Sequence, residues 1–142
     1  MQLTRPSELP WNPIAVQRDS GKEAKTLLSG RDGSPDNYVL VLVRESKAAT
    51  TPRHMHNFDQ LRLTLSGRTN YGPGAWIEPG EIAYFPEGVP YGPEECEGNR
   101  VGLVFHFGGA SGNGFASKRQ VTAARERLEG TGTFDRGLLR RT

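Results

Sequence analysis

The sequence predicts an all-β protein of one domain, an antiparallel sandwich or barrel with a short α-helix near its C-terminus. A chain of 142 residues is long enough to bury a single core. Its 18 glycines and 10 prolines separate short runs that are either apolar or strictly alternating. Such spacing is typical of short strands joined by turns.

Several segments have a strand pattern. Residues 38–43 are apolar on both faces and rich in β-branched side chains, which indicates a buried strand. Residues 60–66 alternate strictly, with leucines on one face and polar side chains on the other. Further strands are predicted over residues 53–58, 69–77, 81–85 and 101–107.

The two ends of the chain differ from this core. Residues 1–37 are rich in proline and predict an irregular arm that packs on the barrel, with one or two short strands. Ser117 and Gln120 have the spacing of a capping box, which predicts a helix of about twelve residues that ends near Gly130. The predicted parts are an arm (1–37), the barrel core (38–107), and a Gly-rich connector, helix and basic tail (108–142).

Composition argues against several classes of partner. A net charge of +2 is too small to indicate nucleic acid or an anionic membrane. The basic residues that gather late in the chain are interpreted as a solvated helix and tail. No apolar run approaches the roughly 20 residues of a membrane helix, and the N-terminus lacks the core of a signal peptide. A cytoplasmic protein is therefore expected.

The three histidines point most directly to a function. His54 and His56 are one residue apart, so on a strand both side chains would share one face. His106 lies on another predicted strand, opposite its apolar face. Imidazole is a common ligand of transition metals, so a metal site is the first hypothesis to consider.

The spacing after the histidine pair resembles the first motif of the cupin family. That motif is His, any residue, His, three or four residues, Glu, six residues, Gly. Here it is formed by His54, His56, Gln60 and Gly67, with three residues before Gln60 and six before Gly67. The glutamine therefore occupies the position of the family's metal-binding glutamate.

The second cupin motif is also present in an altered form. It is Gly, five residues, Pro, any residue, Gly, two residues, His, and here it is formed by Gly80, Pro86, Gly88 and Tyr91. Tyr91 replaces the histidine. The resemblance covers residues 38–107 and implies a cupin-type antiparallel jelly-roll β-barrel with a ligand pocket at its centre.

The first function that this resemblance implies is that of a metal-dependent enzyme. His54 and His56 carry over as metal ligands, and Gln60 would ligate through its amide oxygen. The implied cofactor is one divalent transition metal ion (Fe, Mn, Ni or Zn). His106 and Tyr91 are the candidate catalytic residues that move a proton, and Tyr91 is also a candidate for substrate binding.

Arg62 is the other candidate for substrate binding. It shares a strand face with Gln60, and a buried guanidinium needs an acidic side chain or an anionic ligand group. Periodicity alone places the leucine face inside and Arg62 in solvent. The register of the resemblance places Gln60 and Arg62 inside, and the leucine face would then pack against a partner subunit in a homodimer.

Three functions stay open on this sequence. The first is a metal-dependent oxygenase, lyase or isomerase that acts on a small organic molecule, carboxylate-bearing if Arg62 faces the pocket. The second is a cupin that binds a small molecule without turnover. The third is a metal-free isomerase or epimerase that uses His106 and Tyr91 as an acid–base pair across the pocket, and it would keep its activity in a chelator.

Overall fold

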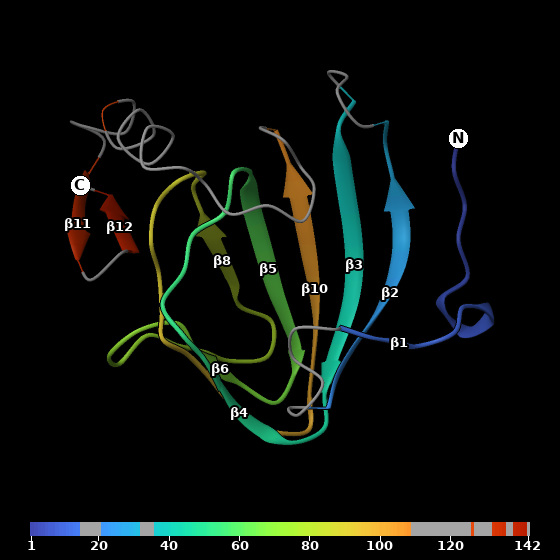
Figure 1. The fold of residues 1–142 in the computed structure, drawn as a ribbon, viewed down its shortest axis with the longest axis horizontal. Coiled ribbons are helices and arrows are strands. Elements are labelled where there is room, and N and C mark those ends of the chain that lie inside the picture. Colours follow the sequence, from blue (N-terminus) through green and yellow to red (C-terminus); the bar gives the residue numbers. More distant parts are fainter. Residues whose placement is uncertain (15–20, 32–35, 109–125, 127–131, 136–137, 142) are drawn as a thin grey trace.

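The computed structural model describes residues 1–14, 21–31, 36–108, 126, 132–135 and 138–141. Two antiparallel sheets face each other as a jelly-roll barrel (Figure 1). The larger sheet has the order β1-β2-β3-β10-β5-β8 and the smaller β4-β9-β6-β7. The strands of the two sheets are β1 (Asn12–Pro13), β2 (Lys22–Ser29), β3 (Tyr38–Glu45), β4 (Ala48–Thr51), β5 (Asp59–Ser66), β6 (Thr69–Asn70), β7 (Trp76–Ile77), β8 (Ile82–Phe85), β9 (Glu94–Glu97) and β10 (Arg100–Phe107).

The all-β, jelly-roll prediction is confirmed. Strands lie in or across the segments predicted over 38–43, 60–66, 69–77, 81–85 and 101–107. β10 lies between β3 and β5, and it places His106 opposite Val39 on one side and Gln60 on the other. This register brings the third histidine beside the first cupin motif.

The strand predicted over residues 53–58 is wrong. The strand in this part of the chain is β4, which ends at Thr51, and the following Pro52 has no N–H to continue a ladder. Beyond it only His54 pairs, in an isolated bridge with Tyr91 in which each backbone N–H donates to the other residue's carbonyl (3.1 and 2.9 Å). The histidine pair therefore lies on a crossing segment that is joined to the second motif.

The larger sheet extends into the predicted N-terminal arm. β2 pairs with β3 from Lys22 to Ser29, next to the most apolar strand of the sheet. The helix predicted from Ser117 to Gly130 lies outside the described residues, except for residue 126. The predicted basic tail contains a hairpin of β11 (Gly132–Asp135) and β12 (Leu138–Arg141). Among the described residues, no helix has the length and apolar character needed to cross a membrane.

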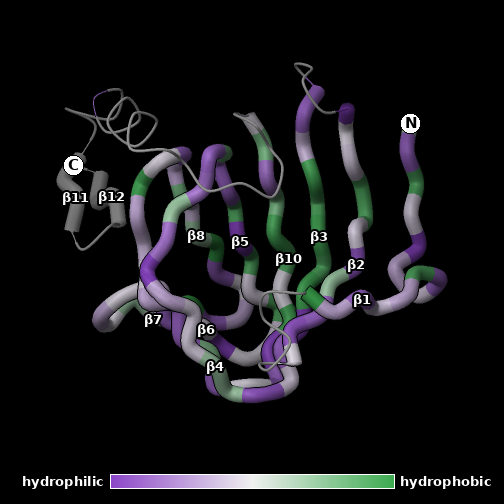
Figure 2. The backbone as a smooth tube through the Cα atoms, viewed as in Figure 1, coloured by the Kyte–Doolittle hydropathy of each residue, from purple (hydrophilic) through white to green (hydrophobic). Residues whose placement is uncertain are grey.

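The interior of the barrel is unusually polar. Figure 2 shows the most hydrophobic stretches along β2, β3 and β10, whereas the segments around β4 and β6 are mostly hydrophilic. On β5 the buried side chains are Gln60, Arg62 and Thr64, while Leu61 and Leu65 are exposed. The register implied by the cupin resemblance is therefore right for this strand, and the expectation from periodicity alone is wrong.

Candidate functional site

The predicted site residues gather in the barrel interior and form two zones. Gln60 and Tyr91 are each 1 % exposed and Arg62 is 7 % exposed, so these three form a deep zone. His54, His56 and His106 are half-buried and form an outer zone. A ligand that enters from solvent therefore contacts the imidazoles before it reaches the deep groups.

Arg62 is the centre of the deep zone. Its Nε donates to Gln60 Oε1 (2.9 Å) and its Nη2 to Tyr91 Oη (2.6 Å). Its Nη1 donates to Glu94 Oε2 (2.7 Å), which makes an ion pair between the two sheets. The guanidinium thus has its acidic partner within the chain, and this arrangement does not require the substrate carboxylate that the sequence offered as an alternative.

Glu94 connects Arg62 to a second group of buried charges. Lys22 Nζ lies 3.6 Å from Glu94 Oε1 and 3.0 Å from Glu45 Oε1. Arg100 pairs with Glu45 (2.8 Å) and donates to Tyr71 Oη (2.9 Å). Three cations and two carboxylates therefore form one buried network. Although burial alone would raise the pKa of Glu94, the charges of Arg62, Lys22 and Arg100 lower it well below its usual value.

His56 links this buried network to the outer zone. Its Nε2 lies 3.1 Å from the Tyr91 hydroxyl, which is also the acceptor for Arg62. Burial raises the pKa of the Tyr91 phenol above its ordinary value, so this group stays protonated at neutral pH. The His54 ring lies edge-on to the His56 ring, with centroids 4.9 Å apart, and its Nδ1 contacts the Pro52 carbonyl oxygen at 2.8 Å.

His106 completes the outer zone with Phe58, a residue that the sequence analysis did not select. The Phe58 ring stacks on His106 at 4.4 Å and on His56 at 4.7 Å, and its side chain is 1 % exposed. Burial, assisted by the positive charge of Arg62, lowers the pKa of His106 to about 4. This imidazole is therefore neutral at pH 7.

The four motif positions do not fit a divalent metal ion as the family motif would hold it. Gln60 and Tyr91 direct their oxygen atoms at the guanidinium of Arg62, and His56 Nε2 contacts the Tyr91 hydroxyl. None of the four positions carries a carboxylate, and a permanent cation is bonded to two of them. Among the described residues, no group of three or more His, Cys, Asp or Glu side chains is placed to hold a metal ion.

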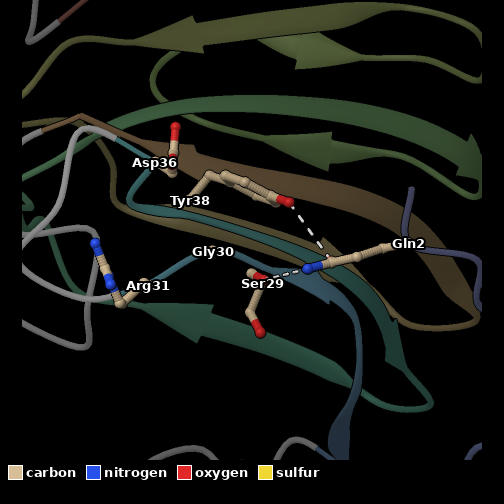
Figure 3. A pocket seen from close by; sticks show the side chains of 6 residues that line it. All are labelled: Gln2, Ser29, Gly30, Arg31, Asp36 and Tyr38. Carbon is tan, nitrogen blue, oxygen red and sulfur yellow. Dashed lines mark hydrogen bonds between the residues drawn. The ribbon is translucent and has the colours of Figure 1, made fainter.

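A separate depression lies where β2 leads into β3 (Figure 3). The Gln2 side-chain amide donates to the Ser29 carbonyl (3.3 Å), and its oxygen accepts from Tyr38 Oη (3.5 Å). No motif residue lines this depression, and Gln2 of the N-terminal segment forms part of its wall. It is not part of the histidine site. The lining residues are Gln2, Ser29, Gly30, Arg31, Asp36 and Tyr38.

Comparison with known proteins shows the fold. No protein-family model and no curated protein matches this sequence. Among solved structures, an RmlC-like cupin from Shewanella frigidimarina superposes with a TM-score of 0.61 at 14 % identity, over 75 % of this chain and 89 % of that one. The polyketide cyclase RemF from Streptomyces resistomycificus gives 0.57 at 20 % identity, over 88 % and 93 %.

A third solved structure that superposes on this chain is KdgF from Halomonas sp., with a TM-score of 0.60 at 16 % identity over 74 % of this chain and 93 % of that one. The chain therefore has the cupin fold. The matched proteins include an enzyme, the polyketide cyclase. At these identities the side chains of the site have to be interpreted from this chain's own geometry.

Proposed function

We propose that this chain is a cupin enzyme that transfers a proton on a small carbonyl compound bound at the mouth of the barrel. His56 is the proton-transfer group, Tyr91 positions it, and neutral His106 donates a hydrogen bond to the substrate oxygen. The observation that carries this proposal is the 3.1 Å contact between the half-buried His56 Nε2 and the buried Tyr91 hydroxyl.

We assign the hydrogen bonds at Tyr91 from its contacts. The phenol oxygen accepts from Arg62 Nη2 and from His56 Nε2–H, and the phenol's own proton is directed to Gln60 Oε1 at 3.5 Å. His56 then has its lone pair on Nδ1, and this nitrogen takes the proton from the substrate carbon and returns it. Tyr91 is a positioning residue here, because at 1 % exposure it lies behind the imidazole.

The outer zone supports a carbonyl substrate. A neutral imidazole is a suitable donor to an oxygen atom on which negative charge develops during proton removal from the neighbouring carbon. His106 is held neutral by burial and by Arg62, and it stacks on the same Phe58 ring as His56. His56, the proposed base, and His106, the proposed hydrogen-bond donor, therefore both stack on Phe58.

Proton exchange with solvent tests this function directly. In D₂O with excess chelator, wild-type protein is expected to exchange α-protons of one or more ketones or keto acids that bind it, measured by ¹H NMR. We expect His56→Gln to lower the exchange rate about 10²- to 10⁴-fold, the usual contribution of a positioned acid–base group. Tyr84→Phe, which removes a hydroxyl on the outer face of β8, is the matched control and should exchange at the wild-type rate.

Two results would contradict the proposal. If the protein binds such compounds and exchanges none of their protons, the non-catalytic binding cupin is the better description. If exchange disappears in chelator and returns with a divalent ion, the metal-dependent function is correct. The observation that favours this metal-dependent function is the closeness of the His54 and His56 rings, whose centroids lie 4.9 Å apart.

We also propose that a second copy of this chain covers the outer face of β5 and β8. Leu61, Leu65, Ile82 and Tyr84 are 37 to 63 % exposed there. β8 is the terminal strand of the six-stranded sheet, so two copies related by a two-fold axis can meet along it and cover the same patch on each other. This is the partner expected for the leucine face from the sequence.

A charge at the centre of this patch should break the dimer. Wild-type protein is expected to have the mass of a dimer in light scattering coupled to size exclusion, and Ile82→Lys that of a monomer. Ile82 is the most exposed of the four side chains, so the lysine should not disturb the fold of the monomer. Thr26→Lys, at an exposed site on β2, should leave the dimer intact. A monomeric wild type would disprove the proposed interface.

A further inference from the structure

We propose that the guanidinium of Arg62 takes the place of the metal ion in this barrel, so that the chain carries its site cation covalently and keeps divalent ions out. The inference rests on the proposed function, since it concerns the same site and explains how that site operates without an ion. The inference depends on the partners of the Nε, Nη1 and Nη2 groups of Arg62, each of which donates to a different side chain.

The first argument is the occupation of the oxygen donors. Two of the four positions that would surround an ion in the cupin motif are Gln60 and Tyr91. Both direct their oxygen atoms at Arg62, at 2.9 and 2.6 Å. A metal ion at these oxygens would have to displace a cation that already occupies them.

The second argument is that the guanidinium is held firmly in this position. Its Cζ lies 5.1 Å from the ring centroid of Tyr71, 5.3 Å from that of Phe85 and 5.2 Å from that of Tyr91. Cations are attracted to aromatic faces at such distances. Together with the 2.7 Å ion pair to Glu94, these rings form a cage around a side chain that is 9 % exposed.

The third argument concerns charge. The residues at the four motif positions are two histidines, an amide and a phenol, all neutral when they act as donors. A divalent ion would therefore bring two further positive charges next to a guanidinium, with no carboxylate among its ligands. The Glu94 carboxylate, which contacts Arg62, is already paired with it and lies 3.6 Å from Lys22.

The test compares metal binding by the wild type with that of a variant in which this cation is removed and the family's carboxylate restored. Tag-free wild-type protein is offered Zn(II), Ni(II), Mn(II), Co(II) and anaerobic Fe(II), then desalted and measured by elemental analysis. We expect far less than one ion per chain. Gln60→Glu/Arg62→Leu/Glu94→Leu is expected to bind Co(II) at one ion per chain, at least about 100-fold more tightly than wild type.

Two controls identify the site. Adding His54→Ala and His56→Ala to the triple variant should abolish Co(II) binding and its visible absorption spectrum. Arg68→Leu/Glu97→Leu removes an exposed bidentate ion pair of the same chemistry and should leave metal binding unchanged from wild type. This matched pair separates the effect of the caged guanidinium from a general change of charge.

Two outcomes would overturn the inference. The first is a wild-type protein that holds one ion per chain and loses it in His54→Ala/His56→Ala; this result needs no other variant to fold. The second is a triple variant with a native circular dichroism spectrum that still binds no Co(II). Proton exchange in chelator is scored separately, so a metal-binding wild type that still exchanges protons disproves only this inference.

Discussion

Replacing Glu94 with leucine is expected to lower the free energy of unfolding by about 3 to 5 kcal/mol, the usual result of leaving a buried charge without its partner. The reason is the ion pair across the two sheets, in which Glu94 Oε2 accepts from Arg62 Nη1 at 2.7 Å. Without the carboxylate, the buried Arg62 loses its ion-pair partner, and Lys22 shares Glu45 with Arg100. Urea denaturation followed by circular dichroism measures the loss.

The double variant Arg62→Leu/Glu94→Leu should recover most of this stability. Both charges are then removed, and the leucines can pack against the aromatic rings that surround the guanidinium. Glu97→Leu is the matched control at the other end of the same strand, because its partner Arg68 is exposed and such pairs contribute little. Equal unfolding free energies for Glu94→Leu and Glu97→Leu would show that the buried network does not hold the sheets together.

Much of this barrel follows from the sequence because turns and alternation are local properties. The strands β3, β5, β8 and β10 lie where the apolar and alternating runs predicted them. The crossing segment around His54 was misassigned as a strand because its pairing with Tyr91 depends on a contact between residues distant in sequence. β2 was harder to recognise because Lys22 and Lys25 are buried, against the usual location of lysine.

The sequence selected residues of the candidate site but did not predict the hydrogen bonds between them. The motif spacing selected His54, His56, Gln60 and Tyr91, and the structure brings all four together. The motif spacing did not show that Arg62 binds Gln60 and Tyr91, since the Tyr91 contact depends on packing between residues that are distant in sequence. A signal for Glu94 is present in the chain: in the run Glu94–Glu97 the apolar residue is Cys96, and strand alternation puts Glu94 on the same face as Cys96. A glutamate is almost never fully buried unless it is paired, so this position needs an interior cation.

Lowering the pH from 6.5 to 4 should destabilise the protein by up to about 3 kcal/mol through His106 alone. Its pKa is about 4 in the folded protein, below the ordinary 6.5, because of burial and then the charge of Arg62. Between these values the unfolded chain binds the proton that the folded chain excludes. Stability is therefore complete above pH 6.5, falls as the pH drops through this range, and loses nothing further from this group below pH 4.

His106→Phe isolates this contribution. The new ring can stack on Phe58 as the imidazole does, and it cannot be protonated. His54 and Glu94 also have lowered pKa values, so both proteins should lose stability in acid, but the variant should lose less between pH 6.5 and 4. Urea midpoints measured across this range give the difference. Parallel curves for the two proteins would mean that His106 takes up its proton in the folded barrel as easily as in water, and hence that Arg62 and burial do not keep it neutral.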